Sequence, residues 1–235
     1  MNGAGGDAEV PLVGLLKERR RIEEAVRRGE SLLVLGPAGS GKTALAQSVT
    51  ASIPCALHLQ HRPALHEMLV TMATMLLGGK GAGEQTSVHL RGLIWSALAA
   101  SPRLLVLDGI DGSSFQAYRF FQRAYHTPGI TMIAISRDPL RLGELRRLFW
   151  DPRQTVEMTP LSDPEAETLF DRAADRFGLR EFDLADFRPR VLDSARGNPG
   201  QIVEMCRMAR EQQYRAGRHI LFAPLRIDLM ARYLD

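Results

Sequence analysis

The chain is organised around the stretch SLLVLGPAGSGKT, residues Ser31–Thr43. Its first five residues, Ser31–Leu35, form a short apolar run of the length typical of a buried strand. Three glycines fall within the next six positions, and the alanine-rich segment Ala44–Ser52 that follows favours a helix. The sequence therefore predicts a strand, a tight glycine-containing loop and a helix, in that order.

The loop matches the pattern G-x-x-x-x-G-K-[ST], which is typical of loops that hold nucleotide phosphates. Residues without a Cβ let the backbone approach closely, and a helix N-terminus offers unpaired N–H groups and the positive end of its dipole. Lys42 is expected to reach the β- and γ-phosphates, and the Thr43 hydroxyl to ligate Mg²⁺. The expected nucleotide-binding residues are Gly36, Pro37, Ala38, Gly39, Ser40, Gly41, Lys42, Thr43 and Ala44.

Length and composition are those of an ordinary globular protein. The 235 residues suit one large or two small domains, and 45% of them are hydrophobic and 24% charged. Thirty basic residues against 27 acidic ones give a net charge of +3. This mild excess permits contact with nucleic acid but does not by itself indicate it, since no block of five like charges appears.

The positions of the cysteines and histidines predict no disulfide bond and no zinc site. Cys55 and Cys206 lie far apart and form no C-x-x-C pair. His58, His61 and His66 lie near one another, but no cysteine or carboxylate pattern completes a ligand set. No secretory signal or long apolar span is visible, so we expect a cytoplasmic protein with reduced thiols and no membrane contact.

The pattern of apolar runs divides the chain into three parts. Residues 1–9 are small and polar and are expected to be disordered. Residues 10–160 alternate between strand-like and helix-like segments, which predicts an α/β domain with a parallel five-stranded sheet. The expected strands are Ser31–Leu35, Cys55–Gln60, the run within Arg103–Asp111, Ile130–Ser136 and Thr155–Met158.

No strand-like run remains downstream, so residues 161–235 are expected to form an all-helical lid domain. A short helix is also expected at Leu142–Trp150, before the last strand. The expected lid helices run from Ser162 or Asp163 to Phe177, and over Leu184–Ala195 and Pro199–Ala216. The final Leu221–Leu234 is either another helix of this bundle or the beginning of something absent.

A second candidate for the nucleotide site is the aspartate of the run Arg103–Asp111. Four consecutive apolar residues precede Asp108, which is typical of a strand buried on both faces of a parallel sheet. Open α/β sheets bind their ligands at the carboxyl ends of their strands. A carboxylate there, opposite Thr43, would complete the protein's ligands for Mg²⁺.

The order of these features resembles the AAA+ and STAND branch of the P-loop ATPases, over nearly the whole chain. The segment LLVLDGID resembles the NACHT-type form, in which a small residue follows the magnesium aspartate and an acidic residue lies two positions further on. That resemblance implies ATP or ADP with Mg²⁺ as cofactors, and Asp111 as the residue that orients the attacking water. Gly109 stands where the usual AAA+ pattern has a glutamate, which implies slow hydrolysis.

The same resemblance implies roles for residues further along the chain. Arg137, after the fourth strand, is similar to a sensor of the terminal phosphate. Pro199, in the segment RGNPG, is similar to the lid residue that faces the nucleotide. Arg147 and Arg153, with Arg146 as a weaker candidate, lie where similar proteins carry an arginine finger for the neighbouring subunit's nucleotide.

These features imply an ATP-dependent molecular switch, whose nucleotide state controls the position of the lid and assembly with partner proteins or with itself. An alternative from another class is an adaptor ATPase that assembles on DNA, similar to transposition-regulator or origin-recognition ATPases. The basic excess favours the alternative slightly, whereas the lack of a helix-turn-helix or winged-helix segment after the lid opposes it. A small-molecule kinase fits less well, because the helical extension and Arg137 suit a switch better than a substrate-closing lid.

Overall fold

The computed structural model describes residues 10–51, 53–60, 64–78 and 82–234. The expected disorder of residues 1–9 therefore lies outside the described residues. The chain forms two compact units. We call residues 16–37 and 42–158 the α/β unit, and residues 10–15, 38–41 and 159–234 the helical unit, so the tip of the glycine-rich loop groups with the helical unit.

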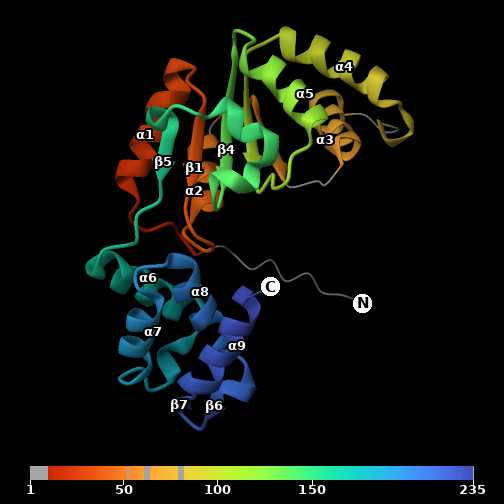
Figure 1. Ribbon diagram of the computed structural model, residues 1–235. Helices are drawn as coiled ribbons and strands as arrows, with labels where there is room; N and C mark the ends of the chain where they lie inside the picture. The colour runs from red at the N-terminus through yellow and green to blue at the C-terminus, as the bar shows by residue number, and fades with distance from the viewer. Residues whose placement is uncertain (1–9, 52, 61–63, 79–81, 235) are drawn as a thin grey trace. The chain divides into compact units, whose positions relative to one another are not determined.

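The α/β unit is built on the expected five-stranded sheet (Figure 1). Its strand order is β2-β3-β4-β1-β5, and every pairing within it is parallel. The register places Asp108 of β3 beside Gln60 of β2 and Ile135 of β4. The strands are β1 (Leu32–Leu35), β2 (Ala56–Gln60), β3 (Arg103–Asp108), β4 (Ile130–Ser136) and β5 (Thr155–Glu157).

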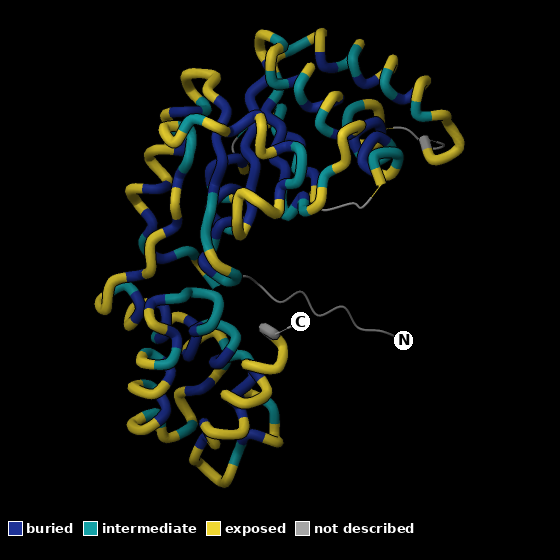
Figure 2. The backbone as a smooth tube through the Cα atoms, in the orientation of Figure 1, coloured by how far each residue is buried: buried dark blue, intermediate teal, exposed yellow. Residues whose placement is uncertain are grey.

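Helices cover both faces of this sheet, which explains why its strands are apolar without alternation. Leu105 and Leu107 share one core cluster with the helices α3 (Leu65–Leu77), α4 (Ser87–Ala99) and α5 (Phe115–Tyr125). The intervening side chains, such as Val106, point to the other face, because successive strand residues alternate. On that side α1 (Leu16–Arg28) and α2 (Lys42–Thr50) pack together. Figure 2 shows burial along the strands, which is complete in β4 and extends over most of β3.

The short helix expected at Leu142–Trp150 is confirmed only in part. It is a 3₁₀ helix that runs over Pro139–Leu148 and is broken at Gly143, which has φ 58° and ψ −129°. A Cβ at Gly143 would lie 2.7 Å from the carbonyl oxygen of Ser113. The break is therefore imposed by close contact with the loop that follows β3, and only glycine fits there.

The helical unit contains α6 (Asp163–Arg176), α7 (Phe187–Ala195), α8 (Pro199–Met208) and α9 (Phe222–Leu234). A capping box of Ser162 and Glu165 begins α6. The expected helix Pro199–Ala216 is too long. The observed helix α8 ends at Met208, and Arg215–Ala216, the last residues of the expected helix, belong to a small antiparallel hairpin. This hairpin of β6 (Arg215–Ala216) and β7 (His219–Ile220) is an exception to the expected all-helical lid.

Short 3₁₀ turns connect several of these elements. They lie at Ala82–Glu84, Pro152–Gln154, Leu179–Glu181 and Gln212–Tyr214. Among the described helices, none has both the length and the apolar character needed to cross a membrane.

Candidate nucleotide-binding site

The glycine-rich loop adopts a conformation that depends on its glycines. Gly39 and Gly41 have φ values of 76° and 86°, in the region that residues with a Cβ rarely adopt. Lys42 begins α2 and is only 9% exposed. Its ammonium donates hydrogen bonds to the carbonyl oxygens of Gly36 and Pro37, each at 2.7 Å. The loop therefore bends around the lysine, and its cationic nitrogen lies within the bend.

Thr43 and Asp108 meet as the sequence predicts. The Thr43 hydroxyl, in the first turn of α2, donates to the Asp108 carboxylate at the end of β3 over 2.8 Å. These are two hard oxygen ligands side by side, which fits Mg²⁺. Among the described residues, no group of three or more His, Cys, Asp and Glu could hold a metal ion. A magnesium ion held here would thus take its other ligands from phosphate oxygens and water, as this ion usually does.

The pKa of Lys42 is set by its burial and by two charged neighbours. Burial lowers the pKa of Lys42, and the nearby charge of Arg137 lowers it further, while Asp108 acts in the opposite direction. Both larger effects penalise the charged ammonium. A bound anion would reverse the penalty, so the site is electrostatically suited to phosphate.

Two further expected residues lie beyond the ends of the neighbouring strands β3 and β4. Arg137 directly follows β4 and is exposed, close enough to Lys42 to influence its pKa. Asp111 lies in the loop after β3, where its carboxylate pairs with Arg141 at 3.6 Å. The charges of Arg137 and Asp108 therefore both act on the Lys42 ammonium, whereas the Asp111 carboxylate is paired with Arg141.

The tip of the loop is tied to the start of α8. The Asn198 side chain donates to the carbonyl oxygen of Ala38 at 2.9 Å, and the Gly200 N–H donates to that of Gly39 at 2.8 Å. A Cβ on Gly200 would lie 2.6 Å from the Gly39 Cα, so the two backbones are in close contact. Pro199, the expected lid residue, lies between these two anchors.

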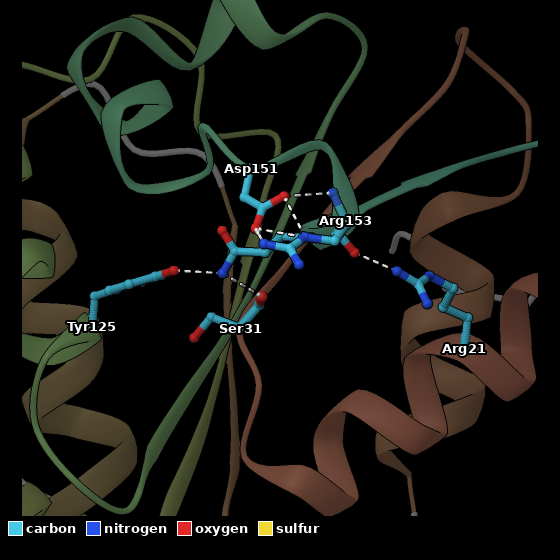
Figure 3. Close-up of polar contacts among 6 residues, drawn as sticks. Arg21, Ser31, Tyr125, Asp151 and Arg153 are labelled. Carbon is cyan, nitrogen blue, oxygen red and sulfur yellow. Dashed lines mark hydrogen bonds and ion pairs between the residues drawn. The ribbon is translucent and has the colours of Figure 1, made fainter.

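The candidate arginine fingers lie outside this group of residues. Arg153 forms a bidentate ion pair with Asp151 just before β5 (Figure 3). The backbone carbonyl oxygen of Arg153 accepts a hydrogen bond from the Arg21 guanidinium. This is the amino end of the sheet, opposite the strand ends that carry Asp108. Arg147 pairs with Glu144 at 3.0 Å. Neither arginine is brought to the chain's own candidate site.

His58 was not expected near the site; its ring nitrogen Nε2 lies 2.6 Å from the hydroxyl of Thr50. Burial lowers the pKa of His58, and the Asp108 carboxylate partly opposes that shift. A usable signal existed, because neighbouring strands in register place His58 and Asp108 on one face. Arg141 was missed as well, since nothing local to it indicates a pair with Asp111.

Comparison with known proteins gives structural likeness but no match in sequence. No protein-family model matches the chain, and no curated protein matches it. A structure of the ORC1 protein of Aeropyrum pernix in complex with DNA has a TM-score of 0.69 at 16% identity, covering 94% of this chain and 66% of that one. A point mutant of the RuvB protein of Thermotoga maritima has a TM-score of 0.59 at 17% identity, covering 94% and 71%.

A third similar structure is a Walker-type ATPase of Pyrococcus abyssi, with a TM-score of 0.63 at 13% identity, covering 95% of this chain and 74% of that one. At such identities the likeness concerns the fold alone. The chain shares with these structures a fold made of a parallel α/β sheet domain and a helical C-terminal region. It spans about two thirds of the length of the ORC1 chain that it matches.

Proposed function

We propose that the chain binds ATP and ADP with Mg²⁺ and hydrolyses ATP slowly, as a molecular switch. The observation that carries this proposal is the 2.8 Å contact between Thr43 and Asp108, beside a buried lysine in a loop of the phosphate-binding pattern. Sixty-five residues separate these two side chains in sequence, so their meeting is a property of the fold. The fold shared with RuvB and ORC1 structures agrees with it.

Each residue of the site has a distinct part in this proposal. The Lys42 ammonium would exchange its two carbonyl partners for phosphate oxygens, which raises its pKa toward the ordinary value. Thr43 and Asp108 would hold Mg²⁺, which when bound neutralises and polarises the phosphate oxygens. Arg137 would contact the terminal phosphate and so distinguish ATP from ADP.

Slow turnover is part of the proposal because the usual base is missing. Gly109 occupies the position where the AAA+ pattern has glutamate, and the next carboxylate, Asp111, is paired with Arg141. To orient a water, Asp111 would first have to loosen this pair. We infer that the nucleotide acts mainly as a bound signal, which controls the lid and assembly with a partner protein or with further copies of the chain.

The proposal is tested by calorimetry with ATP and with ADP in the presence of Mg²⁺, together with ATP turnover and particle mass with and without ATP. Lys42→Ala should lose most of the ATP affinity. Lys17→Ala, which removes the same charge from an exposed position on α1, should keep it. If the wild-type chain shows no affinity for adenine nucleotides, or if neither turnover nor mass responds to Lys42→Ala, the proposal fails.

An arginine acting between subunits follows only if the chain assembles. A mixture of Lys42→Ala with Arg153→Ala chains tests it, and Arg147→Ala is tested in the same way. The first chain lacks its own site but supplies the arginine, while the second keeps its site. Turnover that recovers in the mixture supports a finger in trans, and turnover that stays at the level of the separate chains excludes the arginine tested.

The second candidate function is ATP-dependent assembly on DNA. Its support is the structural likeness to an ORC1 protein solved with DNA, together with the net charge of +3. Binding through phosphates must weaken steeply as salt rises. Mobility shifts of duplex DNA, measured with and without ATP between low and physiological salt, should show salt-sensitive retention that needs ATP; complete absence of retention removes this candidate.

A further inference from the structure

A pocket of about 420 Å³ lies between α4 and α5, far along the chain from the glycine-rich loop. Helix α4 contributes Arg91 and Trp95, and α5 contributes the rest. The full lining is Arg91, Trp95, Gln116, Arg119, Phe120 and Arg123. Three of the six residues are arginines, and the lining includes no aspartate or glutamate.

The two helices that form this pocket carry basic residues and no acidic ones. Neither α4 nor α5 contains an acidic residue, and together they carry three arginines. These two helices therefore have a local formal charge of +3, which attracts negatively charged groups to the pocket between them.

The arginines of the pocket are not neutralised within the described part of the chain. None of the three takes part in an ion pair there, and the buried Nε of Arg91 has no hydrogen-bond partner. A buried donor without a partner costs free energy until a ligand satisfies it. The guanidinium carbon of Arg123 lies 4.3 Å from the ring centroid of Trp95, which fixes the plane of its N–H donors.

Apolar side chains extend the same two helix faces beyond the pocket. Val88 precedes Arg91 by three residues, and Phe115 precedes Arg119 by four, so each lies one helical turn away on the same face. Val88 is 79% exposed and Phe115 55% exposed. The surface therefore offers oxyanion donors flanked by uncovered hydrophobic groups.

We propose that this pocket docks an acidic segment of a partner protein, with carboxylates on the arginines and an apolar side chain against Val88 or Phe115. Guanidinium groups bind carboxylates in a bidentate manner, and tryptophan and arginine are the residues that dominate binding energy at protein interfaces. A nucleic-acid strand fits less well, because Arg123 already covers a face of Trp95 on which a base would stack.

The experiment selects random dodecapeptides displayed on phage against the wild-type chain and measures the selected peptides by fluorescence anisotropy. We expect sequences rich in Asp and Glu that contain an apolar residue. The double variant Arg119→Gln and Arg123→Gln should bind them at least tenfold more weakly. A matched control, Arg20→Gln and Arg27→Gln, removes two exposed charges from α1 and should bind them as the wild type does.

Three outcomes overturn the inference: no acidic enrichment, equal binding by the double variant, or displacement of the peptide by oligothymidine of equal charge that binds more tightly. If the double variant does not fold, Trp95 emission in a Trp150→Phe background replaces it. The acidic peptide must change that emission by moving Arg123, and an unchanged spectrum at saturation contradicts the proposal. All measurements are made without nucleotide, so their failure is distinguishable from failure of the ATP proposal.

Discussion

Replacing Gly143 by alanine tests how the loop after β3 is held in place. The φ of 58° with ψ −129° costs a residue with a Cβ about 1–3 kcal/mol. The new methyl group would lie 2.7 Å and 2.8 Å from the carbonyl oxygen and nitrogen of Ser113, which adds about 1–3 kcal/mol of overpacking. These are backbone atoms that no rotamer change can move. We therefore expect Gly143→Ala to destabilise the α/β unit by about 2–6 kcal/mol.

Urea unfolding followed by tryptophan emission measures this loss, because Trp95 and Trp150 both lie in the α/β unit. The control is Gly92→Ala, at an exposed position inside α4 where a Cβ meets nothing within 4 Å. That change should stabilise the unit by about 0.5–1 kcal/mol. If Gly143→Ala unfolds within about 0.5 kcal/mol of wild type, the spread of ordinary surface substitutions, the reasoning is refuted.

A functional consequence follows from the contacts that Gly143 permits. The Ser113 hydroxyl accepts from the Leu145 N–H at 3.1 Å and donates to the Leu142 carbonyl oxygen, while the Gly112 N–H donates to the Arg141 carbonyl oxygen. These bonds fix the loop that carries Asp111. A methyl group at Gly143 separates the two segments, so any nucleotide turnover that depends on this loop should fall together with stability.

Three further predictions concern single side chains. His58→Gln should flatten the pH dependence of stability. Because the pKa of His58 is lowered in the folded chain, the unfolded chain binds more protons below about pH 6.5, and the stability of the wild type falls as the pH drops through this range. Urea midpoints between pH 7 and 5 measure this fall. Asn198→Ala removes the side-chain oxygen that caps α8 at the Gln201 N–H and should cost about 1 kcal/mol of thermal stability, whereas a loss near zero would mean that the cap contributes nothing. Burial raises the pKa of Cys206 to about 12, so a disulfide reagent should modify Cys55 quickly and Cys206 only on unfolding; rapid reaction of both thiols in the native chain would contradict the structure.

The sheet was predictable because its signals are local and repeat in the sequence. A mostly apolar run such as Ile130–Ser136 is expected to be buried on both faces of a parallel sheet, between two layers of helices, and it is buried along its whole length. The signal of the glycine-rich loop is equally local, since its glycines, Lys42 and Thr43 all lie within residues 36–43. Asp108 followed from topology, because parallel strands end at a common edge.

The predicted helix bounds are wrong where residues distant in sequence determine the local conformation. Periodicity continued the helix from Pro199 to Ala216, but the chain turns after Met208 because Tyr214 is buried and donates its hydroxyl to Asp228 of α9 at 2.6 Å. Nothing in the sequence of the segment after Met208 indicates this hydrogen bond. The 3₁₀ segment around Gly143 is similar, because its shape is imposed by the backbone of Ser113.

The position of Lys42 bears on how the site would gain affinity. The ammonium is already withdrawn from water and bonded to two neutral carbonyl oxygens, so the unfavourable burial of its charge accompanies folding rather than ligand binding. Exchanging a neutral partner for an anionic one then strengthens each hydrogen bond without a further loss of hydration. The neighbouring Arg137, which disfavours the ammonium in the free chain, would share the same anion. One bound phosphate would thus reduce the repulsion between these two cations. The charge of such a ligand, more than its apolar surface, would then be the main source of affinity.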